Sequence, residues 1–335
     1  MTRVAVLGAG SWGTAFALVC ADASSDVVLW ARRPELAQAI NERGENPDYL
    51  PGIALPAGIR ATSSAEEALS GAEYVVLAIP SQQLRTHLAP WSALLGPASV
   101  LVSLAKGVEL GTAKRMSEVI VEVAGVEDDR VAVVSGPNLA KEVAQRQPAA
   151  SVVACRDAGV AERLQKVCHS PSFRPYTNSD VTGCELAGAT KNVIALAVGM
   201  AVGLGFGDNA RASVITRGLA ETTRLGVTLG ADPYTFAGLA GLGDLVATCS
   251  SPLSRNRTFG EKLGQGLSVA DIAASTRQVA EGVKSCESIL DLARRHGVDL
   301  PIVEHVAYVV RGEMTPVEML RSLVSRSAKP ERHGW

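Results

Sequence analysis

The chain has 335 residues, of which 47% are hydrophobic and 20% are charged, so a disordered chain is excluded and two hydrophobic cores can form. A net charge of -2 gives no sequence-wide attraction for nucleic acid or for an anionic membrane, so the expected partner is a small molecule. The six cysteines form no CxxC pair and the five histidines lie at no metal-ligand spacing, so we expect buried thiols in a reducing cytoplasm and no metal site.

The first predicted element is a short aliphatic strand at 4–7. The residues around it lack the basic flank and apolar core of a signal peptide, so we do not expect secretion. GAGSWG follows at once, with Gly8, Gly10 and Gly13, and leads into an apolar helix at 14–21. A GxGxxG motif between a strand and a helix is the fingerprint of dinucleotide binding, because its glycines allow a tight turn and a close approach of the pyrophosphate. The sequence therefore predicts a nicotinamide dinucleotide site at the N-terminus of this helix.

The second predicted strand, 26–30, ends where an NAD-binding protein usually has an acidic residue for the ribose 2′-hydroxyl. Here the chain continues with Ala31, Arg32 and Arg33. Two guanidinium groups at this position attract a 2′-phosphate, so we expect NADPH to be preferred and NADH to be accepted. The alternative is that both arginines are solvated loop charges that tolerate either cofactor.

Further strands alternate with amphipathic segments and predict an α/β domain with a doubly wound parallel sheet. The strands are predicted at 74–79, 99–104, 131–135 and 151–155, with helical segments such as 112–123 and 161–168 between them. Ligands of such sheets lie at the carboxyl ends of the strands. Lys106 follows one of these ends and is a candidate point charge for substrate or cofactor, although a solvated loop lysine is the alternative.

From about residue 184 the pattern changes to apolar runs at helical spacing, which predict an all-helical second domain. These runs lie at 185–205, 212–225, 233–240, 267–276, 285–296 and 316–323. We expect a dinucleotide-binding domain at 1–180, a helical substrate domain at 181–326, and a polar tail at 327–335. The apolar run 186–206 contains Lys191 and Asn192, and what remains is shorter than the ~20 residues that a bilayer requires. It is interpreted as the central helix of the second domain.

Lys191 is the candidate general acid or base. A carbonyl that receives a hydride needs a proton on its oxygen and positive charge nearby. Lys191 lies in GATKNV at the start of the predicted apolar helix, where burial brings the proton affinity of an amine toward the working pH. The alternative is a lysine that extends from the helix start to solvent.

The segment 238–256, GLAGLGDLVATCSSPLSRN, is predicted to be a glycine-rich loop that holds a small anion. Arg255 and Asn256 offer donors for a phosphate, whereas Asp244 is expected to hold Lys191 in place. The alternative is an ordinary surface loop in which Ser254 caps a helix.

Several motifs in chain order resemble those of the bacterial NAD(P)-dependent glycerol-3-phosphate dehydrogenase family. They are GAGSWGTA near the start, SLAKG around Lys106, SGPN at 135–138, ELAGATKNV around Lys191, ITRGLAE at 215–221, and GLGDLVATCSSPLSRN. The glycine motif is generic, but GATKN followed by GDL and SRN is specific to this family.

The resemblance implies the reversible reduction of dihydroxyacetone phosphate to sn-glycerol 3-phosphate, a phospholipid precursor, by a cytoplasmic homodimer. It makes the helical domain at 181–326 the substrate and dimerisation domain. It implies catalytic roles for Lys191, Asp244 and Lys106, with Lys191 as general acid or base. The implied substrate-binding residues are Lys106, Gly136, Lys191, Asp244, Ser254, Arg255 and Asn256. The implied cofactor-binding residues are Gly8, Gly10, Ser11, Trp12, Gly13, Arg32, Arg33, Lys106, Ala140, Arg255, Val279 and Glu281.

The chain departs from the family pattern after SGP, where it has Asn138 and Leu139 and the family often has Ser or Thr followed by Phe. We therefore give Asn138 no substrate contact. Two other functions stay open from the residues themselves. One is a reductase of the wider hydroxyacid dehydrogenase class, whose substrate carries a carboxylate. The other is a non-catalytic module that senses NADPH and has no need of Lys191.

Overall fold

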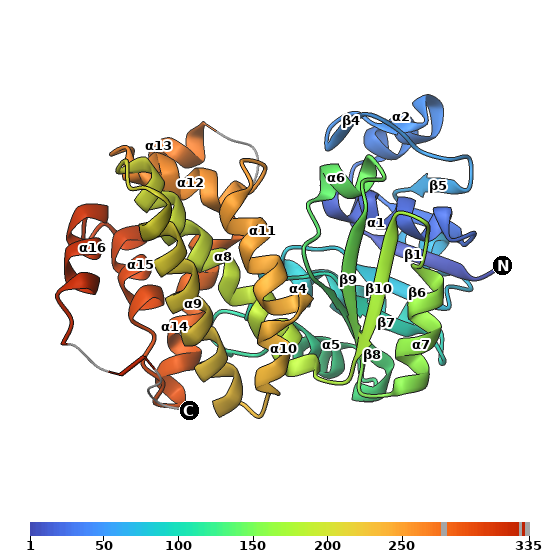
Figure 1. Ribbon diagram of the computed structural model, residues 1–335. Helices are drawn as coiled ribbons and strands as arrows, with labels where there is room; N and C mark the ends of the chain where they lie inside the picture. The colour runs from blue at the N-terminus through green and yellow to red at the C-terminus, as the bar shows by residue number, and fades with distance from the viewer. Residues whose placement is uncertain (276–279, 328–329, 332–335) are drawn as a thin grey trace. The chain divides into compact units, whose positions relative to one another are not determined.

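The computed structural model describes residues 1–275, 280–327 and 330–331, and its helices and strands are drawn in Figure 1. The chain forms two compact units. Unit 1 consists of Met1–Lys106 and Arg115–Val181, and unit 2 consists of Gly107–Lys114 and the chain from Thr182. The segment 107–114, which the sequence pattern places in the first domain, therefore packs with the second unit. Residues 328–329 and 332–335 of the predicted tail lie outside the described residues.

Unit 1 is built on a single large sheet. Its strands are β1 (Arg3–Leu7), β2 (Asp26–Trp30), β5 (Ile59–Thr62), β6 (Tyr74–Leu77), β7 (Val100–Ser103), β8 (Val131–Ser135), β9 (Ala149–Ala154) and β10 (Phe173–Asn178). Their order is β10-β9-β8-β7-β6-β1-β2-β5, and all neighbours are parallel except β8 and β9. The predicted doubly wound sheet is confirmed, with one antiparallel pair that the sequence pattern does not predict.

Helices cover both faces of this sheet. Because neighbouring residues of a strand point to opposite faces, each strand contributes to two cores. In β1, Val4 and Val6 belong to one hydrophobic core, whereas Ala5 and Leu7 belong to another. The first core includes α1 (Ser11–Asp22), α2 (Pro34–Arg43), α6 (Ala140–Ala144) and α7 (Ala158–Val167). The second includes α3 (Ala65–Leu69), α4 (Leu84–Trp91) and α5 (Met116–Ala124), and three short 3-10 turns join these elements at Ser81–Gln83, Ser92–Leu94 and Asp128–Arg130.

Three parts of unit 1 are not predicted by the sequence pattern. The edge strands β5 and β10 are short or polar, and β10 contains Pro175, which a strand tolerates at a sheet edge. The third is the antiparallel hairpin of β3 (Glu45–Asn46) and β4 (Leu50–Ala54), whose turn lies at 47–49. This hairpin lies beside the start of α1, where Ser11 donates to the carbonyl oxygen of Tyr49.

The strand order places the expected ligand crevice at the carboxyl ends of β1 and β6. From β1 the chain builds outward through β2 to β5 and then returns to β6 on the other side of β1. Such a reversal of strand order leaves a crevice beyond the strand ends, where dinucleotides bind in this class of fold. Gly8 follows β1 and Ala78 follows β6, so both lie at this reversal.

Unit 2 is helical. Its elements are α8 (Val181–Gly203), α9 (Asp208–Thr228), α10 (Pro233–Ala237), the π-helical turn η4 (Leu239–Gly243), α11 (Asp244–Ser250), α12 (Arg255–Gly264), α13 (Val269–Ala274), α14 (Glu281–Arg295), α15 (Pro301–Arg311) and α16 (Pro316–Val324). Figure 1 shows α8 running among α9, α11 and α14. Among the described residues, α8 is the one helix long and apolar enough to span a bilayer, and 89% of its apolar window is buried. It is the core helix that the sequence predicts.

Glycines let α8 and α12 touch backbone to backbone. A Cβ atom on Gly199 of α8 would lie 2.1 Å from the carbonyl oxygen of Arg257, and a Cβ atom on Gly260 of α12 would lie 2.1 Å from the carbonyl oxygen of Leu196. The same relation holds one turn later, where a Cβ atom on Gly203 would lie 2.1 Å from the oxygen of Glu261. The separation of these two helices is therefore fixed by the absence of side chains.

The segment 107–114 is fastened within unit 2 by packing and by hydrogen bonds. Val108 and Ala113 are buried in the same hydrophobic core as α8 and α14. Arg295 of α14 donates to the carbonyl oxygen of Thr112 at 3.0 Å and to that of Gly111 at 2.8 Å. Lys106, the last residue of unit 1 before this segment, is thus followed at once by chain that belongs to unit 2.

Candidate active site

The turn between β1 and α1 has the geometry of a dinucleotide-binding loop. Gly8 has φ +129°, and a Cβ atom there would lie 2.4 Å from the carbonyl oxygen of Ala78. A Cβ atom on Gly13 would lie 1.9 Å from the carbonyl oxygen of Gly8, whereas one on Gly10 would meet nothing within 4 Å. The missing side chain of Gly10 therefore leaves open room before the helix N-terminus, where a pyrophosphate fits.

The hairpin turn at 47–49 is fastened to this loop. Asn46 is fully buried, and its Nδ2 donates to the carbonyl oxygen of Ala9 at 2.9 Å and to Oγ1 of Thr14 at 2.8 Å. Ser11, a predicted cofactor residue, donates from its Oγ to the carbonyl oxygen of Tyr49 at 3.0 Å. Trp12 has a buried Nε1 that meets no hydrogen-bond partner among the described residues. Ser11 and Trp12 are both in the first turn of α1.

Arg32 and Arg33 follow β2 and are both exposed. Arg33 donates to Oδ2 of Asp48 in the hairpin turn, and this hydrogen bond raises the pKa of the Arg33 guanidinium. The side chains of Arg33 and Asp48 are 50% and 43% exposed, so solvent screens the pair. One of the two cations predicted to meet a 2′-phosphate thus has a carboxylate partner that the sequence pattern does not reveal.

Lys106 links the carboxyl ends of β7 and β8. Its Nζ donates to the carbonyl oxygen of Gly136 at 3.1 Å, so two predicted substrate-binding residues lie together. Gly136 has φ +145° and is buried, a backbone geometry that favours glycine. Asn138 donates through its Nδ2 to Oγ of Ser151 at 3.0 Å, and Ala140 begins α6. All of these residues belong to unit 1.

Lys191 forms a buried cluster with two residues of α11. Its Nζ donates to Oδ1 of Asp244 at 2.5 Å and to Oγ1 of Thr248 at 2.7 Å, and the hydroxyl of Thr248 donates to the same Asp244 oxygen at 3.3 Å. The side chains of Lys191 and Asp244 are 10% and 2% exposed. The expected contact between Lys191 and Asp244 is present, and their opposite charges compensate each other away from solvent.

The position of Lys191 within its helix differs from the prediction. Lys191 lies in the middle of α8, which begins at Val181 rather than near residue 185. The first five residues of α8, which end at Glu185, mix small and polar side chains and so mask the apolar pattern, although Glu185 is buried. A mid-helix lysine beside a carboxylate replaces the alternative of a lysine that extends from a helix start.

The predicted loop at 238–256 is largely helical, which corrects the sequence interpretation. Gly241 allows η4 to pack closely against α10, since a Cβ atom on this glycine would lie 2.2 Å from the carbonyl oxygen of Phe236. Asp244 begins α11 and Thr248 lies one turn later on the same face, which explains why both reach Lys191. Thr248 could not be predicted as a site residue from a loop, because a loop has no such periodicity.

Ser254, Arg255 and Asn256 stand at the start of α12. Ser254 Oγ accepts from the backbone N–H of Arg257 at 3.3 Å, so the helix-cap alternative is realised. Asn256 is buried, and its Nδ2 donates to Oδ1 of Asn192 at 2.9 Å while its Oδ1 accepts from the N–H of Gly282 at 2.9 Å. Both ends of the Asn256 amide are thus used to join α8, α12 and α14.

Arg255 is exposed and borders a cavity of about 240 Å³. The cavity is lined by Pro252, Leu253, Arg255, Thr258, Phe259, Lys262, Ile272 and Ala280. Glu281, a predicted cofactor residue, is the first residue of α14 and follows Ala280. Val279, the other cofactor residue predicted there, lies outside the described residues.

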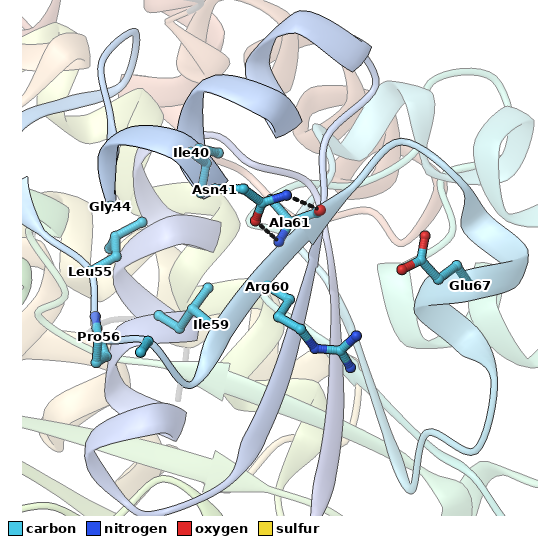
Figure 2. Close-up of a pocket in the computed structure, with 10 residues that line it drawn as sticks. Ile40, Asn41, Gly44, Leu55, Pro56, Ile59, Arg60, Ala61 and Glu67 are labelled. Carbon is cyan, nitrogen blue, oxygen red and sulfur yellow. Dashed lines mark hydrogen bonds between the residues drawn. The ribbon is translucent and has the colours of Figure 1, made fainter.

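A larger cavity of about 430 Å³ lies in unit 1, between α2 and β5 (Figure 2). Figure 2 shows two hydrogen bonds between the Asn41 amide and the backbone of Ala61. The Nδ2 of Asn41 donates to the carbonyl oxygen of Ala61, and the N–H of Ala61 donates to Oδ1 of Asn41, both at 2.8 Å. None of the predicted site residues lines this cavity. The predicted residues form two groups instead, one at the strand ends of unit 1 and one around Lys191 in unit 2.

Two family models match most of the chain. The model described as the N-terminus of NAD-dependent glycerol-3-phosphate dehydrogenase matches residues 3–161, and the model described as the C-terminus of the same enzyme matches residues 180–321. A protein named glycerol-3-phosphate dehydrogenase (NAD(P)+) from Streptomyces griseus is 66% identical over 98% of this chain and 98% of its own length. A protein of the same name from Thermobifida fusca is 64% identical over the full length of both chains.

A solved structure is similar over nearly the whole chain. The glycerol-3-phosphate dehydrogenase of Coxiella burnetii has a TM-score of 0.92 and 34% identity, and the match covers 97% of this chain and 99% of that one. Together with the two family models and the relatives, this likeness confirms the resemblance seen in the motifs. The chain belongs to the NAD-dependent glycerol-3-phosphate dehydrogenase family.

Proposed function

We propose that the protein reduces dihydroxyacetone phosphate to sn-glycerol 3-phosphate with NADPH or NADH, in a reversible reaction. The observation that carries this proposal is the buried cluster of Lys191, Asp244 and Thr248 in a chain that also has a dinucleotide loop. A buried lysine held by a carboxylate and a hydroxyl is suited to give a proton to a substrate oxygen. NADPH is the preferred cofactor in this proposal, because Arg32 and Arg33 follow β2.

A nicotinamide dinucleotide held at the turn between β1 and α1 would supply the hydride for the carbonyl carbon of the substrate. Lys191 gives a proton to the carbonyl oxygen as its double bond to carbon is reduced, so one hydride and one proton convert the ketone to an alcohol. Asp244 and Thr248 hold the Lys191 amine and compensate its charge. In the reverse direction Lys191 takes the hydroxyl proton as a base.

The phosphate end of the substrate calls for cations and N–H donors. We assign this end to Lys106 of unit 1 and Arg255 of unit 2. Gly136, which accepts from Lys106, and Ser254, which precedes Arg255, are assigned to the substrate as well. Asn256 contributes by orientation as well, because its amide joins Asn192 to the start of α14. Arg255, Glu281 and Ala140 are further proposed to meet the cofactor.

A substrate panel with both cofactors tests the proposal. Consumption of NADPH is expected with dihydroxyacetone phosphate and not with hydroxypyruvate or ketopantoate, which represent the hydroxyacid class. Lys191→Met is expected to lower kcat by about a thousandfold while NADPH binding is retained. If the wild-type protein binds NADPH and turns over no substrate, the sensing module is the better interpretation.

The proposed product supplies the backbone of phospholipids, and we place the enzyme in the cytoplasm as a homodimer. The dimer is tested by sedimentation equilibrium of the purified protein, with a mass of twice 34.9 kDa expected. A mass of one chain across the micromolar range would contradict it.

A further inference from the structure

The hairpin turn beside the dinucleotide loop carries a carboxylate, Asp48, that meets Arg33. We propose that Asp48 is a specificity-determining residue, which holds the Arg33 guanidinium and thereby weakens the preference for a nucleotide with a 2′-phosphate. The proposal rests on the proposed use of NADPH and NADH and explains how one site accepts both. It assigns a role to a residue that no motif of the sequence singles out.

Hydrogen bonds of the hairpin hold the turn that carries Asp48. The residue two positions earlier, Asn46, is fully buried and bonds to Ala9 and Thr14 of the glycine motif at 2.9 and 2.8 Å. Its Oδ1 also accepts from the backbone N–H of Tyr49 at 3.2 Å. The turn is therefore anchored by a buried amide at its start.

The far side of the turn is anchored as well. Ser11 Oγ donates to the carbonyl oxygen of Tyr49 at 3.0 Å, and Gly52 N–H donates to Oε2 of Glu45 at 3.2 Å across the hairpin. Asp48 lies between these anchors, so the fold presents its carboxylate at the end of β2. This is where the ribose 2′ group of a dinucleotide lies in a Rossmann-type domain.

The charge of Asp48 acts differently on a nucleotide with a 2′-phosphate and on one with a 2′-hydroxyl. The charged groups that act on Arg33 are Asp48 from the turn and Glu35 from the first turn of α2, with Tyr49 close by. A 2′-phosphate carries nearly two negative charges, so Asp48 both competes with it for Arg33 and repels it. A ribose 2′-hydroxyl has no charge and is not repelled by Asp48, and any hydrogen bond that it donates to the carboxylate can also be accepted by the amide oxygen of an asparagine.

The test measures binding of two nucleotides that differ only in the 2′-phosphate, adenosine 2′,5′-bisphosphate and adenosine 5′-monophosphate, by calorimetry on the full chain. Asp48→Asn keeps the shape and the turn preference of the side chain and removes its charge. We expect the Kd of the bisphosphate to fall about three- to tenfold and that of the monophosphate to stay within about twofold. The gain is expected to shrink as salt is raised.

Asp22→Asn is the matched control. Asp22 forms another exposed carboxylate–guanidinium pair in unit 1, with Arg146 at 2.8 Å, but it lies at the other end of α1 from the glycine motif. This variant has the same change in net charge and is expected to leave both Kd values unchanged. A gain equal to that of Asp48→Asn would attribute the effect to net charge and overturn the proposal.

Combining Asp48→Asn with Arg33→Gln tests whether Asp48 acts through Arg33. Arg33→Gln is expected to weaken bisphosphate binding, and adding Asp48→Asn to it should recover much less than in the wild type. An unchanged bisphosphate Kd in Asp48→Asn, or an undiminished gain without Arg33, would refute the proposal, and Asp48→Ser repeats the test if the asparagine variant fails to fold. Failure of the proposed reductase is recognised separately, because a wild-type protein inactive on dihydroxyacetone phosphate can still bind both nucleotides.

Discussion

Replacing Gly260 by alanine is expected to weaken both the fold and the site. The added Cβ atom would lie 2.1 Å from the carbonyl oxygen of Leu196, whereas ordinary contacts of this kind begin at 3.4 Å. Neither backbone can yield locally, so α8 and α12 must separate by more than about 1 Å and lose dispersion contacts along the interface. This overpacking costs about 2–4 kcal/mol, and the better helix propensity of alanine offsets about 1 kcal/mol of it.

The same shift disturbs the start of α12. Asn256 and Asn192 are joined across the two helices at 2.9 Å, so a displacement of about 1 Å breaks their hydrogen bond. Since Asn192 neighbours Lys191 in the sequence, kcat for dihydroxyacetone phosphate is expected to fall about 10- to 100-fold. The loss of stability and the loss of turnover thus have one cause.

Urea unfolding and steady-state kinetics on the two variants Gly260→Ala and Gly207→Ala measure both effects. Gly207 precedes α9 in unit 2, and a Cβ atom there would meet nothing within 4 Å. We expect Gly260→Ala to lose about 1–3 kcal/mol of unfolding free energy and Gly207→Ala less than about 1 kcal/mol. Equal unfolding midpoints for the two variants, with wild-type kcat in both, would refute the argument from close helix packing.

Three other changes test the site and the core. Asp244→Asn leaves the Lys191 ammonium without its buried counter-charge and is expected to lower kcat about 100-fold with little change in the Kd of NADPH, which stopped-flow and calorimetry can compare. Arg255→Ala is expected to raise the KM for dihydroxyacetone phosphate about 10- to 100-fold, and an unchanged KM would place this arginine away from the phosphate. Burial raises the pKa of Glu221 from 4.5 to about 8, so the unfolded chain loses this proton at a lower pH than the folded chain does. The free energy of unfolding therefore falls by roughly 1.4 kcal/mol per pH unit between these two values. Glu221→Gln should lack this part of the fall when unfolding is measured from pH 5 to 8.

The dinucleotide half of the protein could be predicted from sequence because its signals are local. A strand, a glycine motif and a helix follow one another within a few residues, and the structure has β1, Gly8 to Gly13 and α1 in that order. The strand periodicity of β6, β7 and β8 is equally local. The hairpin that carries Asp48 was missed, because its strands are short and its anchor Asn46 bonds to residues more than thirty positions away.

The helical half was harder to predict because its glycines have a different purpose. In 238–256 they suggest a loop, but the chain uses Gly241 to pack a helix against Phe236. With the segment assigned as a loop, Thr248 had no face to share with Asp244, and it was not included in the site. Close packing between helices is a tertiary property, which a glycine in one segment does not reveal.

The segment 107–114 has a consequence for the order of events during synthesis. Val108 and Ala113 are buried in the same core as residues of α8 and α14, and Arg295 of α14 donates to the backbone of Thr112 and Gly111 between them. At about 5–20 residues per second, the ribosome adds Arg295 roughly 10–40 seconds after Thr112. Throughout this interval Val108 and Ala113 lack the complete core that buries them in the folded chain. The segment 107–114, which lies in the sequence between the two parts of unit 1, therefore waits for unit 2 to be nearly finished before it can pack.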